Sequence, residues 1–531
     1  MSATVMNALF ILSSFTVLWA AALAHKHEHF LQCLSIHSRD ISKLIYTPIN
    51  SSYSSLLTSY ALNPRVSIPA TPNPHVIIKP SHLSHIQAAV VCSKSHGFQI
   101  RTRSGGHDAE GLSYISHHLP FIIVDLKNLN SITVNIENNT AWVQSGATIG
   151  EVYYEIAKKS RTLAFPAGVC PTVGFGGHLS GGGYGWLMRK YGLAADNVVD
   201  AYLVDAYGKV LDREAMGEDL FWAIRGGGGG SFGIVVGWKV KLVAVPAIVT
   251  TCQLEKNLDG YAKKLVYQWQ YVANKMDENL LLGVNLTGGN PTQGAKPNHK
   301  ATFFSLFLGN SHDLIATMNT TFPQLGLTNN DCQQTSWIQS TLLAAGFTSR
   351  DPLEFLLTKT SFNTVAYKIK SDYVNKPISK HAFKGIWDRL KSPKMESAQL
   401  LLFPYGGRMS KIPTWETPFS HRAEFMYKIS YVVGWAEQSR EASERNLNWV
   451  REFYEYMSPF VSNSPRAAYV NYRDLDIGMN NEYGSTSYEE ARVWGEMYFG
   501  DNFKRLVRVK NKVDPLNFFR HEQSVPPLAL S

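Results

Sequence analysis

Alternating hydrophobic and polar positions predict the first strands of the chain. Residues 132–136 carry aliphatic side chains at every second position, as a half-buried strand does. Two consecutive asparagines then suit a turn, and residues 141–143 return as a second strand. Thr148 can cap a helix that runs through residues 150–158. With the strands and helices expected over 76–152, this order indicates a βαβ-like half.

The hydrophobic pattern changes after Ile248. Apolar residues fall at helical spacing over 265–272 and again over 447–457. Strand-like runs lie between these helices, at 301–308 and 426–433. Helices outside a sheet suit a substrate-binding domain. A chain of 531 residues is also too long for one simple core, so two or three closely packed domains are expected.

The N-terminus resembles a secretory signal. Residues 8–23 are almost wholly apolar, and 22–24 have the small-x-small form of a cleavage site. The run is short for a membrane span, and no other segment of the sequence approaches one. We expect cleavage after Ala24 and a soluble protein of the secretory pathway, located outside the cell, in the cell wall or in the vacuole.

Composition excludes several classes of protein. Hydrophobic residues make up 44% and charged residues 18% of the chain, which is typical of a globular protein and not of a disordered one. The net charge of +9 comes from scattered Lys and Arg, without a basic run or a nucleic-acid-binding motif. The charge therefore predicts a basic surface, not a nucleic-acid partner.

Secretion changes how the cysteines are interpreted. An odd number of cysteines in an oxidising compartment leaves at least one thiol outside the intramolecular disulfides. The five cysteines are Cys33, Cys92, Cys170, Cys252 and Cys332. Glycosylation sequons agree with a secretory route. They lie at Asn50, Asn138, Asn285 and Asn319.

Three glycine-rich stretches, at 103–107, 174–185 and 226–233, indicate a dinucleotide site. Glycine lets backbone N–H groups approach a phosphate closely. None of the stretches has the Walker A form, and the best G-x-G-x-x-G candidate fails because Leu179 stands at its last position. A nicotinamide-type Rossmann fingerprint is therefore not supported, and no metal site is predicted.

Longer motifs around these glycines resemble the berberine bridge enzyme-like family of plant FAD-linked oxidases. The matching segments are 103–114, 167–174, 189–193, 226–233, 471–476 and 514–519. The resemblance implies an α+β fold of the vanillyl-alcohol-oxidase type. In that fold a two-part FAD-binding domain faces a substrate domain with an antiparallel sheet and helices. The implied boundaries are a signal peptide at 1–24, an FAD-binding domain at 25–248, a substrate domain at 249–470 and a C-terminal return to the FAD-binding domain at 471–531.

The resemblance also implies how the cofactor is held. His107 would bond the 8α-methyl carbon of FAD, and Cys170 would bond carbon 6. Further cofactor-binding candidates are Arg103, Ser104, Gly105, Gly106, Gly174, Gly176, Gly177, His178, Tyr184 and Asn517. Cys33 and Cys92 correspond to a disulfide typical of the family. For Cys252 and Cys332, a second bridge and two buried thiols both remain open.

Catalysis needs a base to take a proton while a hydride leaves for the flavin. Free tyrosine has a pKa near ~10, and a neighbouring cation lowers that value. By resemblance, Tyr472 is the expected base and Lys428 its activator. Val173 stands at a position thought to gate oxygen. Expected substrate-pocket residues are Tyr114, Tyr191 and Ser430.

The resemblance predicts a monomeric oxidase that acts on an allylic or benzylic alcohol or a prenylated phenol, with O2 as the acceptor. Ser430 stands where the alkaloid-cyclising founder of the family has a catalytic glutamate, so berberine-type ring closure is not predicted. Two alternatives remain open. One is a carbohydrate oxidase, and the other is an oxidative or redox-neutral cyclase of prenylated phenols. The sequence does not name the substrate.

Overall fold

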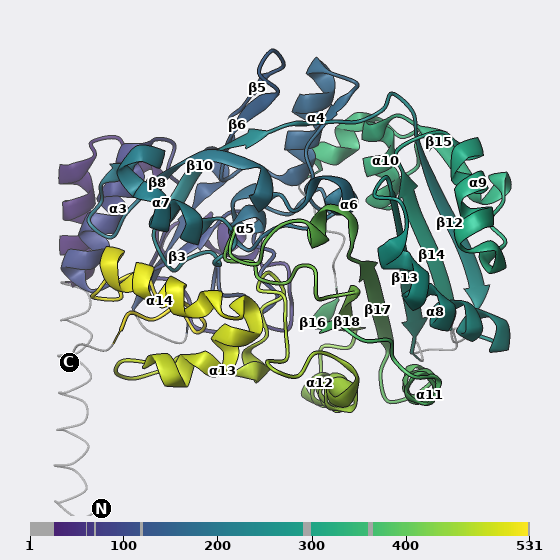
Figure 1. Ribbon diagram of the computed structural model, residues 1–531. Helices are drawn as coiled ribbons and strands as arrows, with labels where there is room; N and C mark the ends of the chain where they lie inside the picture. Colours follow the sequence, from purple (N-terminus) through teal and green to yellow (C-terminus); the bar gives the residue numbers. More distant parts are fainter. Residues whose placement is uncertain are drawn as a thin grey trace, which may run out of the picture.

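The computed structural model describes residues 26–59, 61–67, 71–116, 120–289, 299–358 and 365–528. The predicted signal peptide at 1–24 lies outside these residues. Two halves lie side by side, one with several small sheets and the other built on one large antiparallel sheet (Figure 1). The predicted α+β class is confirmed.

The first half contains two main sheets. One has the order β1-β2-β4-β3, in which β4 pairs in parallel with both β2 and β3. The other has the order β5-β6-β10-β8-β9 and is antiparallel. The bounds are β1 Ile45–Tyr46, β2 Val76–Ile78, β3 Gln99–Arg103, β4 Phe121–Asp125, β5 Ile132–Asn135, β6 Thr140–Gln144, β8 Val198–Val204, β9 Val210–Leu211 and β10 Ile234–Lys241; β7 (Leu163–Ala164) pairs with β11 (Val243–Ala244).

The strand, turn, strand and helix predicted between 132 and 158 are all present. β5 and β6 form a hairpin whose turn includes Asn139, with a φ of 49° that asparagine tolerates better than most residues. Thr148 caps helix α4 (Ile149–Lys159) and forms a capping box with Glu151. The sequence was sufficient to predict these elements because the turn residue and the helix cap act on the backbone of their own segment.

Helix α3 (Leu83–His96) packs against the first sheet and against the N-terminal arm, residues 26–37, in one apolar cluster. It ends at Gly97, whose φ of 63° lets its N–H bond back to the last turn. Cys33 of the arm is bonded to Cys92 of α3, so the predicted disulfide is confirmed. Other helices of this half are α2 (Tyr53–Thr58), α5 (Phe175–Ser180), α6 (Met188–Tyr191) and α7 (Arg213–Ile224).

The second half is built on a seven-stranded antiparallel sheet of order β15-β12-β14-β13-β17-β18-β16. Its strands are β12 Val249–Asn257, β13 Leu280–Gly288, β14 Lys300–Phe307, β15 Cys332–Thr335, β16 Ala366–Val374, β17 Ser397–Pro404 and β18 Tyr427–Trp435. Its helices are α8 Gly260–Val272, α9 Ser311–Thr321, α10 Trp337–Ala344, α11 Lys380–Leu390 and α12 Arg440–Met457. The helices and strands predicted after Ile248 correspond to α8, α12, β14 and β18.

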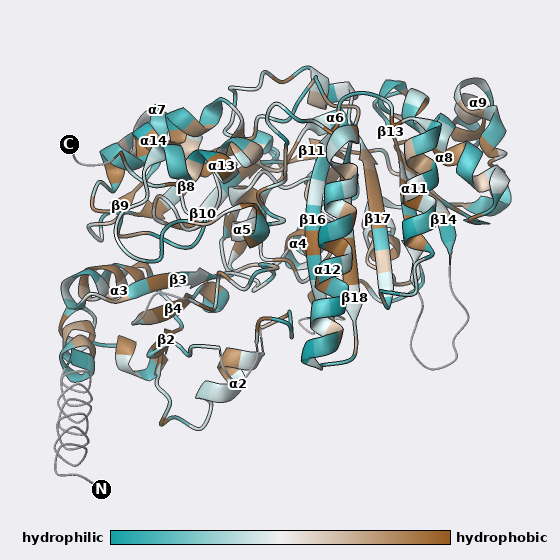
Figure 2. Ribbon diagram, turned by 90° about the horizontal axis from the view of Figure 1, so that it is seen from below, coloured by the Kyte–Doolittle hydropathy of each residue, from teal (hydrophilic) through white to brown (hydrophobic). Residues whose placement is uncertain are grey.

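The two faces of this sheet have different partners. Helices α8, α11 and α12 pack on one face in a large apolar cluster. Figure 2 shows their outer sides as mostly hydrophilic and strands such as β17 behind them as largely hydrophobic. Side chains alternate between faces along a strand, so Leu401 and Phe403 of β17 point the other way and pack toward the first half.

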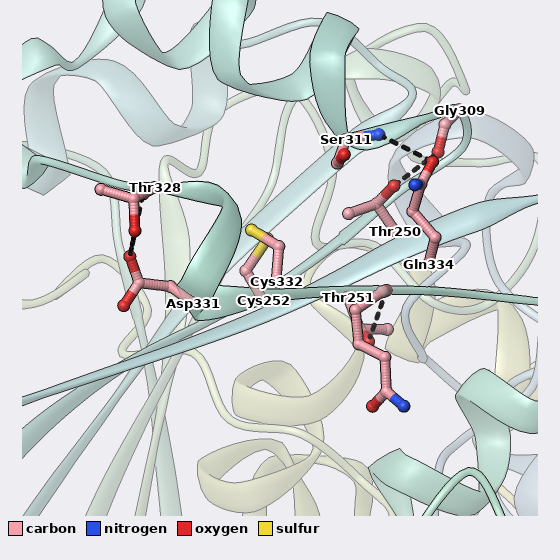
Figure 3. The surroundings of a disulfide bond; sticks show 10 residues. Thr250, Thr251, Cys252, Gly309, Ser311, Thr328, Asp331, Cys332 and Gln334 are labelled. Carbon is pink, nitrogen blue, oxygen red and sulfur yellow. Dashed lines mark hydrogen bonds between the residues drawn. A yellow bond between two sulfur atoms is a disulfide. The ribbon is translucent and has the colours of Figure 1, made fainter.

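Cys252 of β12 and Cys332 of β15 stand directly opposite each other and are bonded (Figure 3). Of the two alternatives left open by the sequence, the structure shows the second bridge. It fastens the edge strand β15 to its neighbour.

The C-terminal residues return to the first half. Helices α13 (Tyr488–Phe499) and α14 (Asn502–Val513) lie along it in Figure 1, and α14 contacts α7. Buried Lys510 of α14 donates to the carbonyl of Ser231 at 2.7 Å and pairs with Asp514 at 2.6 Å. The first half is therefore assembled from both ends of the sequence.

A buried ion cluster ties the two halves together. Lys368 and Lys370 of β16 bind Asp474, with nitrogen–oxygen distances of 2.7 and 2.6 Å. Lys368 also pairs with Glu110, which Arg65 approaches to 2.7 Å. Glu110 follows the loop that holds His107, and Asp474 follows Tyr472, so the cluster connects three segments that surround the candidate site.

Candidate active site

A cavity of about 500 Å³ lies between the glycine-rich loops and the inner face of the seven-stranded sheet. All three glycine-rich stretches contribute to its lining. The opposite wall is largely apolar and comes from β16, β17 and β18. It consists of Tyr367, Ile369, Leu401, Phe403 and Val432.

Close backbone contact between two loops shapes the cavity. A Cβ atom on Gly105 would lie 2.3 Å from the amide nitrogen of Gly174, and one on Gly174 would lie 2.2 Å from that of Gly105. At Gly177, by contrast, a Cβ would meet no atom within 4 Å. Gly106 and Gly176 also line the cavity. Glycine at 105 and 174 lets the two loops pack together, and Gly177 leaves open space at the lining, so the backbone of these loops can lie close to a dinucleotide such as FAD.

The two candidate anchors converge on one hydroxyl. His107 Nε2 lies 2.9 Å from Thr172 Oγ1, and Cys170 Sγ lies 3.5 Å from the same oxygen. The other four cysteines form disulfides, so Cys170 is a free thiol, and it is exposed at the cavity. Burial lowers the pKa of His107 to about 4, although the bond to Thr172 acts in the other direction. The imidazole is therefore neutral at physiological pH.

His178 supports the loop that carries Cys170. Its Nε2 accepts a hydrogen bond from the Gly168 N–H at 3.0 Å, which requires that nitrogen to be unprotonated. Burial lowers the pKa of His178 to about 4, so the acceptor form is kept over the physiological range. Ser104 donates to the Ser145 carbonyl and also lines the cavity.

Three tyrosines form the wall beside Cys170. The ring centroids of Tyr469 and Tyr472 are 5.0 Å apart, those of Tyr184 and Tyr469 are 5.3 Å apart, and both pairs meet edge to face. The hydroxyls of Tyr184 and Tyr472 share a hydrogen bond. All three side chains line the cavity, so Tyr184 and Tyr472 lie where the sequence placed them.

Lys428 stands behind the tyrosines and not in the lining. Its Nζ lies 4.3 Å from the ring centroid of Tyr472 and donates to Ser430 Oγ at 2.9 Å. Ser430 is likewise outside the lining, because residues 428 and 430 share a strand face that the tyrosines cover. The expected pocket position of Ser430 is therefore corrected to a place behind the wall.

The expected pKa of Tyr472 also needs correction. A lowered value was predicted from the neighbouring cation, but burial raises the pKa of Tyr472 to about 12. Burial also lowers the pKa of Lys428 well below its usual range. Within the described residues no carboxylate forms an ion pair with Lys428, and its Nζ faces the rings of Tyr184, Tyr469 and Tyr472 instead.

Two predicted cofactor residues lie outside the cavity lining. Arg103 is fully buried and pairs at 2.8 Å with Asp125, its partner on the adjacent strand β4. Asn517 follows α14 in a turn, with a φ of 52° and an N–H bonded to the Asp514 carbonyl at 3.0 Å. His521, four residues later, lines the cavity instead.

Two predicted pocket tyrosines are also placed elsewhere. Tyr114 is only 1% exposed and packs in a small apolar cluster with Tyr53 and Phe121. The Tyr191 hydroxyl bonds to the Ala244 carbonyl at the junction with β11. Val173, the expected oxygen gate, does line the cavity beside Cys170.

The sequence interpretation missed several lining residues. Arg473 and Asp108 face each other at 3.8 Å between the base segment and the His107 loop. Tyr469 lies three residues before Tyr472, a spacing that could have drawn attention to it. The wall residues Tyr367 and Phe403 lie on strands whose pairing the sequence alone does not give.

The described part of the chain contains no helix long and apolar enough to cross a membrane. The sequon Asn285 lies within β13, between β14 and β17, and its side-chain oxygen is buried. That prediction is corrected, because an asparagine inside a sheet is poorly accessible to a glycosylating enzyme. Asn50, Asn138 and Asn319 are exposed.

Comparisons with known proteins agree with this geometry. A family described as "FAD binding domain" matches residues 74–213, and one described as "Berberine and berberine like" matches residues 468–526. The chain is 50% identical over 501 residues to berberine bridge enzyme-like 18 of Arabidopsis thaliana, covering 94% of this chain and 92% of that protein.

Solved structures give the same result. The structure of BBE-like 28 from Arabidopsis thaliana has a TM-score of 0.89 and 46% identity, and covers 94% of this chain and 100% of that one. Phl p 4, a grass pollen allergen with glucose dehydrogenase activity, has a TM-score of 0.89 and 43% identity, and covers 94% and 99%. An isoleucine-to-valine variant of Phl p 4 is described as a glucose oxidase. With FAD-binding loops, a matching fold and this identity along nearly its whole length, the chain belongs to the berberine bridge enzyme-like family and is an FAD-linked oxidoreductase acting on small molecules.

Proposed function

We propose that the protein is an oxidase of an allylic or benzylic alcohol or a prenylated phenol, with FAD held covalently by both His107 and Cys170. The observation that carries the proposal is that both anchors and Tyr472 face one cavity. When bound, FAD supplies the hydride acceptor and passes the electrons to O2.

Each anchor has a chemical property suited to its role. His107 is neutral at physiological pH, so a ring nitrogen has a free lone pair for bonding to carbon. Cys170 is the one thiol left by the two disulfides, and it is exposed to the same cavity. Thr172 Oγ1 lies within hydrogen-bond distance of both side chains, so the two anchors stand close together.

The double attachment is tested by acid precipitation followed by measurement of protein-bound flavin absorbance. The wild-type protein should retain FAD in the pellet. His107→Ala and Cys170→Ala should each keep one bond and retain it, whereas the double variant should release it. Complete release from the wild-type protein would contradict the attachment.

Tyr472 is the proposed base, because it lines the cavity together with both anchors and its hydroxyl contacts the second cavity tyrosine, Tyr184. It takes the hydroxyl proton of the substrate while the substrate hydride leaves. Its raised pKa means that the phenolate must be formed with the help of a nearby proton acceptor. Lys428 is the group that supports this step, at 4.3 Å from the Tyr472 ring centroid.

The apolar wall favours an aromatic or prenylated substrate over a sugar. Ile369, Leu401 and Val432 offer contact area but no hydrogen-bond partner to a polyol. The glucose dehydrogenase activity of Phl p 4 keeps carbohydrate oxidation as the alternative. A cyclase of prenylated phenols would use the same wall but need not consume oxygen.

Anaerobic flavin bleaching against monolignols, prenylated phenols, alkaloids and sugars separates these candidates, with peroxide measured after air is admitted. Bleaching by alcohols or phenols and peroxide release are expected. Product formation without bleaching would instead establish the redox-neutral cyclase, and bleaching by sugars alone would establish the carbohydrate oxidase.

We further propose that the protein is secreted as a monomeric glycoprotein. The two disulfides and the exposed sequons Asn50, Asn138 and Asn319 support an oxidising compartment. Mass spectrometry of the protein purified from its source should find the N-terminus near residue 25 and glycan at one or more of these asparagines. An intact N-terminus and no glycan would contradict secretion.

A further inference from the structure

The inner face of the large sheet continues beyond the cavity wall. Leu401 of β17 lines the cavity, and its partner on the next strand, β13, is Asn285, which in turn stands opposite Thr302 of β14. All three lie on the face away from the helices, because the residues on either side of each one pack in the apolar cluster with α8, α11 and α12. Neighbouring strands are about 5 Å apart, so Asn285 and Thr302 lie about 5 and 10 Å beyond Leu401.

A second row of polar residues runs beside the first. Val432 of the apolar wall pairs with Gln399 of β17, and Gln399 pairs with Thr287 of β13. Gln399 is exposed, and the other polar residues of the two rows are half-buried. Asn285, Thr287, Thr302 and Gln399 together form a polar strip that borders the apolar wall.

A row of aromatic rings leads from the cavity to this polar strip. The ring centroids of Tyr184 and Phe403 are 5.1 Å apart, and both residues line the cavity. Phe304 lies 5.4 Å from Phe403, and Trp186 lies 6.4 Å from Phe304. Phe304 and Trp186 are outside the lining and are half-buried. Aromatic surface therefore continues past the cavity, and Phe304 shares its strand face with Thr302.

Asn285 has hydrogen-bonding capacity that its neighbours do not use. Its Oδ1 is buried without a hydrogen-bond partner among the described residues, although the side chain as a whole is half-buried. An unpaired buried acceptor is costly. Rotation of the amide about its last bond exchanges the oxygen and the nitrogen, so a ligand hydroxyl at the surface can bond to either group.

Aromatic faces beside amide and hydroxyl groups suit one kind of ligand. A sugar ring has C–H groups on its faces and hydroxyls around its edge. Trp186 and Phe304 offer aromatic contact area to the faces, and Asn285 and Thr302 offer hydrogen bonds to the edge.

We propose that the polar strip and Trp186 form a subsite for a sugar carried by the substrate, which is then the glycoside of a phenolic alcohol. The aromatic ring of the substrate contacts the apolar wall, and the sugar, on the far side of that ring from the reacting alcohol, lies against Asn285 and Thr302. The proposal rests on the proposed function, in which the alcohol reacts beside Tyr472. Asn285 selects the substrate and takes no part in the chemical step.

The first test compares para-hydroxybenzyl alcohol with its phenolic O-glucoside in anaerobic flavin bleaching. The wild type should have the larger second-order rate constant with the glucoside. Asn285→Leu should lower the ratio of the glucoside constant to the alcohol constant by about 10-fold, which corresponds to one lost hydrogen bond. Trp186→Ala should lower the ratio as well. Asn257→Leu is the matched control and should keep it, since Asn257 is exposed on β12, two strands away from β13.

The second test needs no turnover. Phenyl glucoside carries no benzylic or allylic alcohol, and calorimetric titration of the flavin-loaded protein measures its binding against that of phenol. The wild type and Asn257→Leu should bind phenyl glucoside about 10-fold more tightly than phenol, and Asn285→Leu should bind the two about equally.

Equal binding of the two compounds by the wild type, or a preference that Asn285→Leu and Trp186→Ala leave unchanged, would overturn the subsite. Tighter binding of phenyl glucoside without bleaching by para-hydroxybenzyl alcohol or its glucoside would support the subsite and count against the proposed oxidation.

Discussion

The two glycine-rich loops lie so close together at Gly105 and Gly174 that no side chain larger than a hydrogen atom fits between them. Gly105→Ala should lower the free energy of unfolding by about 1–3 kcal/mol, because the new Cβ lies 2.3 Å from a backbone nitrogen and the loops must separate. Thermal or denaturant unfolding measures this change. Gly260→Ala, where nothing lies within 4 Å, is the control and should be nearly neutral.

A substitution at Gly177 can separate an effect on FAD binding from an effect on folding. Gly177→Ala should fold with wild-type stability, since its Cβ meets no atom within 4 Å. It should nevertheless retain less FAD, because the methyl group projects at the cavity lining. Unchanged flavin content in Gly177→Ala would show that FAD does not approach this loop.

Val173 is expected to control the access of O2 to reduced FAD. Val173→Leu should slow reoxidation of reduced FAD by O2 and leave reduction by substrate nearly unchanged, because the larger side chain narrows access without touching Tyr472. Stopped-flow measurement of both half-reactions tests the assignment, and an equal fall in both would contradict it.

At the scale of elements, the bond between β12 and β15 fastens one edge of the large sheet. Cys252→Ser with Cys332→Ser should lower the free energy of unfolding by about 4 kcal/mol, since the bond closes a loop with a sequence separation of 80. Flavin reduction should not change, because the cavity wall comes from β16, β17 and β18 at the other end of the strand order. A slower reduction would show that the edge strand influences the site.

The ion cluster around β16 predicts a pH-dependent stability. Burial alone would raise the pKa of Glu110, but Lys368 and Arg65 hold it below its usual range. A carboxylate with a lowered pKa stabilises the fold above its unfolded pKa of about 4.3, and the contribution is lost as the pH falls through the folded value. Glu110→Gln should therefore destabilise the protein by about 3–5 kcal/mol at neutral pH, because it leaves Lys368 with one fewer partner.

Denaturant unfolding over a pH series measures this effect. The difference between wild type and Glu110→Gln should shrink as the pH falls below about 4. Glu444→Gln on α12 is the control, since its pair with Arg440 is exposed and worth little. A difference that is the same at every pH would show that the charge of Glu110 is not what stabilises the cluster.

At the scale of the whole molecule, local patterns predicted elements better than they predicted the site. The hairpin and the Thr148 cap depend on neighbouring residues, so periodicity and turn chemistry located them. Arg103 sits beside the predicted loop, yet Asp125 on the adjacent strand draws its side chain away from the cavity. That partner is set by strand pairing, which no local pattern contains.

Packing between distant segments also explains why the pKa of Tyr472 was predicted wrongly. Its neighbour Lys428 was identified by resemblance, but the depth of burial depends on how three tyrosines from two separate segments pack over β18. Burial lowers the pKa of the lysine and raises the pKa of the phenol, so proximity alone does not give the charge state. The apolar wall was missed for a related reason, since it is formed by three strands whose order in the sheet differs from their order in the chain.

The return of the C-terminal residues to the first half has a consequence for biosynthesis. Tyr472, Arg473 and His521 all line the cavity, and each follows both anchors, His107 and Cys170, by more than 300 residues. The cavity is therefore incomplete when the two anchors leave the ribosome, and it is completed only after these later residues have emerged. A chain that ends before Tyr472 should therefore retain less flavin than the full chain.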